Sequence, residues 1–153
     1  MSEITRITDQ LKRALYGDAW HGPAVLEALD GFDAKTALAK PIPSAYSAWE
    51  ITLHVTAWFR IMKLRFEGED PDVTRTLDWP PIADPSAKGW TAAIADLKRA
   101  HREFQQVIEA TSESELFVEL PARGYDLYFV LHGMIQHCVY HAGQIALLKK
   151  SIS

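Results

Sequence analysis

Three long segments of the chain place apolar residues three and four positions apart, which is the spacing of one face of an α-helix. The first of these helices is predicted to begin after Ser47 and to run to about Gly68. Ser47 and Glu50 form a Ser-x-x-Glu pattern, which marks a helix N-terminus because each side chain bonds to the other residue's backbone amide. His54 lies inside the apolar stripe of this segment, which is formed by Ile51, Val55, Trp58, Ile61 and Met62.

The other two long helices are predicted in the second half of the chain. Ser86 follows a proline and suits a helix N-cap, and an apolar stripe continues from Trp90 to Ile108. The last helix is predicted to follow Asp126 and to run to about Lys150. One narrow stripe of this helix comprises Val130, Met134, His137, His141, Gln144 and Leu148. Both of its histidines are therefore expected to face the core.

The N-terminal segment is predicted to be a helix, a kink and a shorter helix. Apolar residues from Ile4 to Leu11 have helical spacing. Gly17 and the WHGP run at 20–23 are expected to interrupt that helix before a short one that ends near Leu29.

No segment alternates apolar and polar residues as a half-buried strand does. The expected fold class is therefore all-α, a four-helix bundle formed by one domain over residues 1–153. The connections over 68–86 and 111–126 are long for a simple antiparallel bundle. We expect them to be crossover loops, which can cap a site at one end of the bundle.

The composition is that of an ordinary folded protein, with 24% charged and 48% hydrophobic residues. The net charge is −4 and the basic residues do not cluster, so nucleic-acid binding through a basic face is not expected. No apolar segment is predicted to act as a signal peptide or to span a membrane. Cys138 is the only cysteine and has no disulfide partner within the chain, which favours a reducing, cytoplasmic location.

His137 and His141 lie four positions apart and project side by side from one helix, as two ligands of one metal ion do. The zinc-protease signature is excluded, because it needs glutamate directly after the first histidine and Cys138 is found there. His54 supplies a third imidazole from a facing helix, and helix bundles commonly build metal sites in this way. Without a metal, three inward imidazoles need several hydrogen-bond partners, but histidines that only pack are common. The pattern alone leaves both interpretations open.

Two polar residues near these histidines are candidates for a catalytic role. Glu50 precedes His54 by about one helical turn and is a candidate general base, fourth ligand or acceptor for a ligand imidazole. The competing interpretation, which we favour, is that Glu50 serves the capping box with Ser47. Gln144 follows His141 by about one turn and is a candidate for positioning a metal-bound water, or a polar residue at a helix contact.

Three stretches of the chain resemble the DinB-like family of metal-binding four-helix bundles. They are WHGP at 20–23, SAWEITLH at 47–54 and, above all, LHGMIQHCVYHAGQI at 131–145. The resemblance implies that His54, His137 and His141 bind a divalent metal ion. Zinc or nickel is expected, because imidazole ligands suit both. Such family members often have histidine where this chain has Tyr46, so the mouth of the site is expected to differ.

Three protein ligands leave an open coordination position, which is typical of a catalytic metal. We therefore expect a metal-dependent enzyme that acts on a small-molecule substrate. Hydrolysis is one reaction type, and the resemblance implies a second, S-transfer with a low-molecular-weight thiol as cofactor. The alternative is a non-catalytic metal-binding protein of the stress-response or interaction type. The resemblance also implies a homodimer.

Overall fold

The computed structural model describes residues 1–121 and 123–152. Within these residues the chain is all-α, as predicted, and beyond one isolated β-bridge it contains no β-structure. No helix in the described ranges is long and apolar enough to cross a membrane. The elements are α1 (Glu3–Tyr16), α2 (Val25–Leu29), α3 (Ala34–Leu38), α4 (Ala48–Phe66), α5 (Arg75–Asp78), α6 (Ala87–Ala110), the 3₁₀-helix η1 (Glu115–Phe117) and α7 (Leu127–Ile152).

The three long helices begin at the predicted caps. The Ser47 hydroxyl accepts a hydrogen bond from the Glu50 amide at 3.2 Å, and Oε2 of Glu50 accepts one from the Ser47 amide at 2.7 Å. This reciprocal pair is the predicted capping box at the start of α4. Ser86 caps α6 through its hydroxyl, and the Asp126 carboxylate accepts from a backbone amide in the first turn of α7.

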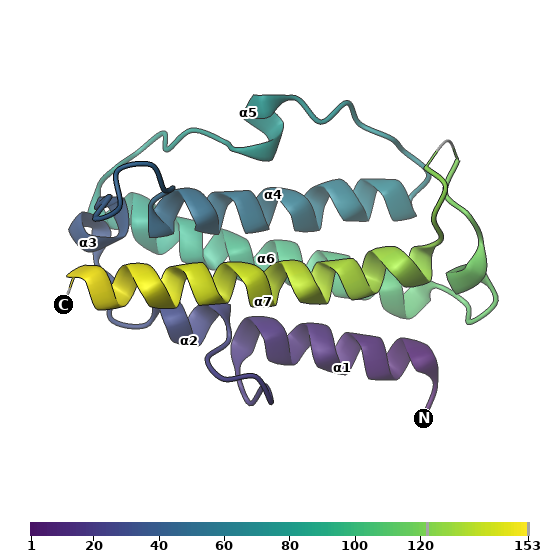
Figure 1. Cartoon of the computed structure of the whole chain (residues 1–153). Coiled ribbons are helices and arrows are strands. Elements are labelled where there is room, and N and C mark those ends of the chain that lie inside the picture. The colour runs from purple at the N-terminus through teal and green to yellow at the C-terminus, as the bar shows by residue number, and fades with distance from the viewer. Residues whose placement is uncertain (122, 153) are drawn as a thin grey trace.

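The long helices lie side by side, as Figure 1 shows for α4, α6 and α7. α1 and α2 follow one another along α7, and α1 also contacts α6. The turn between α1 and α2 holds Gly17 at φ 144° and Asp18 at φ 60°, backbone conformations that a helix does not contain. The predicted interruption of the N-terminal helix is therefore confirmed.

An apolar core fills the space between the helices. Its largest fully buried side chains include Trp49 and Phe59 from α4, Phe104 from α6 and Leu131 from α7. Cys138 is also fully buried there as a free thiol, and burial raises its pKa to about 12. A thiol with this pKa is protonated and inert at neutral pH, so Cys138 serves packing.

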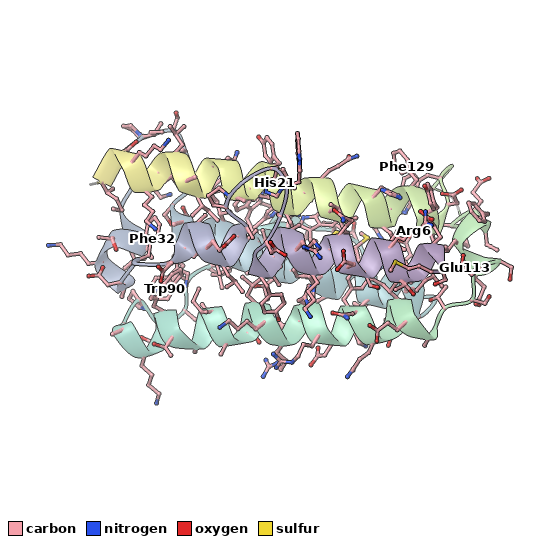
Figure 2. All side chains as sticks on the ribbon, turned by 90° about the horizontal axis from the view of Figure 1, so that it is seen from below. Arg6, His21, Phe32, Trp90, Glu113 and Phe129 are labelled. Carbon is pink, nitrogen blue, oxygen red and sulfur yellow. The ribbon has the colours of Figure 1, made fainter. Side chains whose placement is uncertain are left out.

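Hydrogen bonds between distant residues fasten the N-terminal segment to both ends of α6. The Trp90 indole donates to the carbonyl oxygen of Phe32 at 3.0 Å, and Figure 2 shows these residues together at one end of the bundle. Near the other end, the Ile4 amide donates to the Glu113 carboxylate at 3.2 Å. These two bonds fix the position of α1 and α2 along the long helices.

The connection between α4 and α6 is a crossover segment that passes over the outer side of α4 and carries α5 (Figure 1). Its length predicts such a crossover. The short helices α3, α5 and η1 are not predicted by the sequence pattern, because three to five residues are too few to display a periodic stripe. α5 contacts α4, so the crossover segment is packed onto the helix that carries His54.

Candidate metal centre

Three imidazoles meet between α4 and α7. His54 comes from α4, and His137 and His141 come from successive turns of α7. Nε2 of His137 lies 3.0 Å from Nε2 of His54 and 3.1 Å from Nε2 of His141. The candidate ligand atoms all lie within 4.8 Å of one another. The structure therefore brings together the three histidines that the sequence pattern singled out.

The distances between these nitrogen atoms suit one shared cation. Imidazole nitrogens lie about 2.1 Å from a zinc ion, so two of them are about 3.0 Å apart at a right angle and about 3.4 Å apart at the tetrahedral angle. The observed separations of 3.0 and 3.1 Å lie at the lower end of this range. Two of the three pairs of nitrogen atoms thus already lie at the spacing of ligands on one ion.

Hydrogen bonds on the far side of two rings determine where their protons lie. Nδ1 of His54 is 2.7 Å from the carbonyl oxygen of Asp78, which can only accept, so this nitrogen carries the proton. Nδ1 of His141 is 2.7 Å from Oε1 of Gln144 and donates to it. In both neutral rings Nε2 then directs a lone pair toward the centre of the cluster. Metal-binding histidines usually show this arrangement.

His137 faces both of these lone pairs. One proton on its Nε2 can satisfy only one of them, and its Nδ1 is buried with no hydrogen-bond partner in the described part of the chain. Burial and the neighbouring imidazoles lower the pKa of His137 to about 3, and burial lowers that of His141 to about 4. Burial also lowers the pKa of His54. The rings are therefore neutral at pH 7, the form that binds metals, and the cluster fits a divalent cation.

The crossover segment covers His54 from outside. The Trp79 ring stacks on His54 with centroids 3.9 Å apart, and Tyr46 stacks on Trp79 in turn at 3.5 Å. The Asp78 carboxylate accepts from the Trp58 indole at 2.7 Å and lies 3.2 Å from Nδ1 of His54. Sequence reasoning did not identify Asp78 and Trp79. The available signal was the length of the connection, which indicated a segment able to cap a site.

The structure places the two candidate catalytic residues differently. Gln144 orients the His141 ring, whereas Glu50 contacts none of the three histidines within the described ranges. The Glu50 carboxylate instead accepts from Lys40 at 2.9 Å and from the Ser47 amide at 2.7 Å. Burial raises the pKa of Glu50, but these hydrogen bonds outweigh it and bring the pKa below its ordinary value. The geometry therefore favours the capping interpretation.

The other three histidines lie outside the cluster. His101 is buried in the core, with edge-on ring contacts to Tyr16 and Phe59. His132 packs against the ring of Tyr128 on α7, with centroids 4.5 Å apart. His21 is exposed in the turn between α1 and α2 (Figure 2).

A cleft of about 520 Å³ opens beside the three imidazoles, which form part of its wall. This volume is within the range of small-molecule sites. Besides the imidazoles, its polar lining comes from Arg65 and Asp78. Most of the remaining wall is apolar or aromatic, and it includes Trp58, Met62, Trp79, Tyr125, Phe129, Val130, Met134 and Tyr140. A ligand in the cleft lies against the imidazoles and a largely apolar surface.

Comparison with known proteins places this arrangement in a family. No curated protein and no solved structure gives a significant match to the chain. The sequence model of the DinB superfamily matches residues 19–145, which include all three clustered histidines and most of the helical bundle. The chain therefore belongs to the DinB superfamily.

Proposed function

We propose that the protein is a divalent-metal-dependent enzyme that acts on a small molecule, with His54, His137 and His141 as the metal ligands. The observation that carries this proposal is the convergence of their Nε2 atoms beside a cleft of small-molecule size. Zinc or nickel is the expected ion, because imidazole suits both and both rank high in divalent affinity. A bound ion would supply Lewis acidity and stabilise negative charge on an oxygen or sulfur atom.

The chain's own residues prepare the site for such chemistry. Asp78 and Gln144 fix the orientation of two of the ligand rings through their Nδ1 atoms. Trp79 covers one face of His54 and keeps water from it. The apolar lining of the cleft holds the body of the substrate and strengthens electrostatic interactions beside the imidazoles, because it excludes water.

Two reaction types suit this site, hydrolysis and transfer of a group to the sulfur of a thiol. The second needs a thiol from outside the chain, because Cys138 is fully buried and has a pKa of about 12. A low-molecular-weight thiol cofactor meets that need. Activity that requires such a thiol identifies a transferase, and activity in its absence identifies a hydrolase.

Elemental analysis of protein purified without a histidine tag tests the metal site. We expect about one equivalent of zinc or nickel per chain, lost in the His137→Ala variant. His132→Ala is the matched control, because His132 lies on the same helix outside the cluster. Metal content that is equal in all three proteins, or protein that takes up no zinc or nickel on titration, contradicts the proposal.

The alternative function is a non-catalytic metal-binding or interaction protein, in which the ion ties α4 to α7. Removal of the ion with a chelator distinguishes the structural role from the catalytic one. The core packs α4 against α6 and α7 without the histidine cluster, so a catalytic ion should leave the bundle folded when it is removed. Loss of the helical circular dichroism signal on chelation would favour the structural role.

We further propose a homodimer located in the cytoplasm. Support for a dimer comes from Phe129, Tyr140 and Leu147, which are exposed apolar residues on one face of α7. Phe129 and Tyr140 also line the cleft, so such a dimer would place the cleft next to the subunit interface. Sedimentation equilibrium tests the dimer, and a mass of one chain at micromolar concentration contradicts it.

The free thiol of Cys138 supports a reducing compartment such as the cytoplasm, and fractionation of the cells that make the protein tests that location.

A further inference from the structure

We propose that the cleft beside the metal centre binds a small molecule with an apolar body and a carboxylate group, and that Arg65 binds the carboxylate. The inference rests on the proposed function, since it names the class of substrate for the same site. It concerns the end of the cleft away from the three imidazoles.

Arg65 is a buried cation in the last turn of α4 that lacks a full set of partners. Only 7% of the residue is exposed, and its Nε has no hydrogen-bond partner in the described part of the chain. Its ion pair with Asp70 spans 3.4 Å, longer than the roughly 2.7–2.9 Å of a charge-assisted hydrogen bond. A buried guanidinium destabilises the fold unless it is paired and hydrogen-bonded. No hydrogen bond from the terminal Nη atoms of Arg65 is present among the described residues, and Arg65 lines the cleft, so an anionic ligand there can accept from these atoms.

The charges around Arg65 leave its positive charge poorly compensated. Asp70 is bonded closely to Arg123, so one carboxylate serves two guanidinium groups. Asp72 lines the adjoining cavity but is exposed and forms no ion pair with either arginine among the described residues. Asp78, the carboxylate on the cleft itself, already contacts an indole and an imidazole.

Trp58 connects Arg65 to the metal centre. The guanidinium carbon of Arg65 lies 5.8 Å from the Trp58 ring, and that ring lies 5.9 Å from the ring of His137. Tyr125 and Phe129 also line the cleft. The apolar body of a ligand can thus lie along these aromatic rings, with its carboxylate at Arg65 and its other end beside the imidazoles.

A carboxylate suits this end of the cleft better than a phosphate does. A guanidinium group binds a carboxylate through two parallel hydrogen bonds, and a single negative charge matches the one net positive charge that remains when Arg65 and Arg123 share Asp70. A phosphate monoester carries nearly two negative charges, whereas Arg65 is the one lysine or arginine among the described residues that line the cleft.

Calorimetric titration of the zinc-loaded protein with 3-phenylpropionate and its neutral analogue 3-phenylpropionamide tests the proposal. We expect the carboxylate to bind at least about tenfold more tightly than the amide, and Arg65→Gln to abolish that preference while leaving amide binding unchanged. Arg60→Gln is the matched control, because Arg60 is exposed on the same helix and pairs with Asp96. It should keep the full preference.

Metal-free protein separates binding at Arg65 from binding at the metal. A preference that survives chelation and is lost in Arg65→Gln supports the proposal. A preference that is lost on chelation and survives in Arg65→Gln places the carboxylate on the metal, which agrees with the proposed function and overturns this inference. If the protein takes up no zinc but prefers the carboxylate in an Arg65-dependent way, the inference about Arg65 holds and the proposed metal-dependent function is overturned.

Absence of binding by 3-phenylpropionate and by decanoate at millimolar concentration, with or without zinc, also overturns the inference. Circular dichroism and thermal unfolding establish that each variant is folded. Should Arg65→Gln fail to fold, Arg65→Lys replaces it, since lysine keeps the charge but loses the two parallel donors. That variant should lose only part of the preference for the carboxylate.

Discussion

The indole of Trp79 lies parallel to the imidazole of His54, with ring centroids 3.9 Å and planes 8° apart. The residue before it, Asp78, accepts the Nδ1 proton of the same imidazole through its carbonyl oxygen. The crossover segment therefore holds His54 at both its face and its edge. By contrast, His141 is oriented by Gln144 from its own helix. His54 is thus the candidate ligand whose position depends on a loop.

Trp79→Ala should weaken zinc binding by roughly two- to twelvefold, because an aromatic contact of this kind contributes about 0.5–1.5 kcal/mol to holding the ring in place. Trp79→Phe keeps a stacked ring and should lose less. Competition with a chromophoric chelator measures both affinities. Equal affinities in the wild-type, Phe and Ala proteins would show that the stack does not order His54.

Gln144→Ala should lower zinc affinity by roughly 10- to 100-fold, the usual effect of removing the partner of a ligand imidazole. The substitution removes the oxygen that accepts the Nδ1 proton of His141 and so releases the ring to rotate. Gln144→Glu retains an acceptor and should retain the affinity. Unchanged affinity in Gln144→Ala, with a change only in turnover, would instead favour the positioning of water or substrate by Gln144.

His101 should make the folded state sensitive to acid. It is 1% exposed, and neither ring nitrogen has a hydrogen-bond partner among the described residues. Burial, together with the charges of Arg102 and Lys12, lowers its pKa to about 4, whereas an unfolded chain has a histidine pKa of about 6.5. Between these values the unfolded chain binds a proton that the folded chain does not, so stability falls as the pH drops through this interval.

The His101→Phe variant should lack this contribution. The stability of the wild type relative to the variant should fall by roughly 2–3 kcal/mol between pH 7.5 and 4.5. Urea unfolding of the two metal-free proteins at both pH values measures the difference. A difference that does not change with pH would mean that His101 has the same pKa in the folded and the unfolded chain.

The helices and the histidine cluster were predictable because each rests on local signals. Ser47 and Ser86 mark helix starts by their chemistry, and His137 and His141 share a face by spacing alone. His54 could be added because it lies on the apolar stripe of another helix. These inferences need the helical period and the capping rules, and no knowledge of how the loops run.

The residues around the cluster were not predictable in the same way. Asp78 contributes a backbone carbonyl to His54, which every residue type possesses, so its identity gives no signal. Trp79 meets His54 only because of the path of the crossover segment. Arg65 is a basic residue in the last turn of a helix, where an exposed side chain beside the helix dipole is the ordinary expectation. Its burial beside the cleft follows from tertiary packing.

Substitutions of Glu50 separate its role in the helix cap from the role of a general base. Glu50→Gln keeps an acceptor for the Ser47 amide and loses only the ion pair with the partly exposed Lys40, so stability should change by less than about 1 kcal/mol. Glu50→Ala also removes the capping acceptor and should cost about 0.5–2 kcal/mol. Urea unfolding measures both values.

Both Glu50 variants should retain the wild-type metal content, since the carboxylate is bonded to Lys40 and Ser47 and does not contact the three histidines. With an active substrate, their kcat should also equal that of the wild type. A general base contributes about 100-fold or more to the rate. A loss of that size in Glu50→Gln, at unchanged metal content and stability, would therefore assign the catalytic role to Glu50 and require its side chain to leave the cap during turnover.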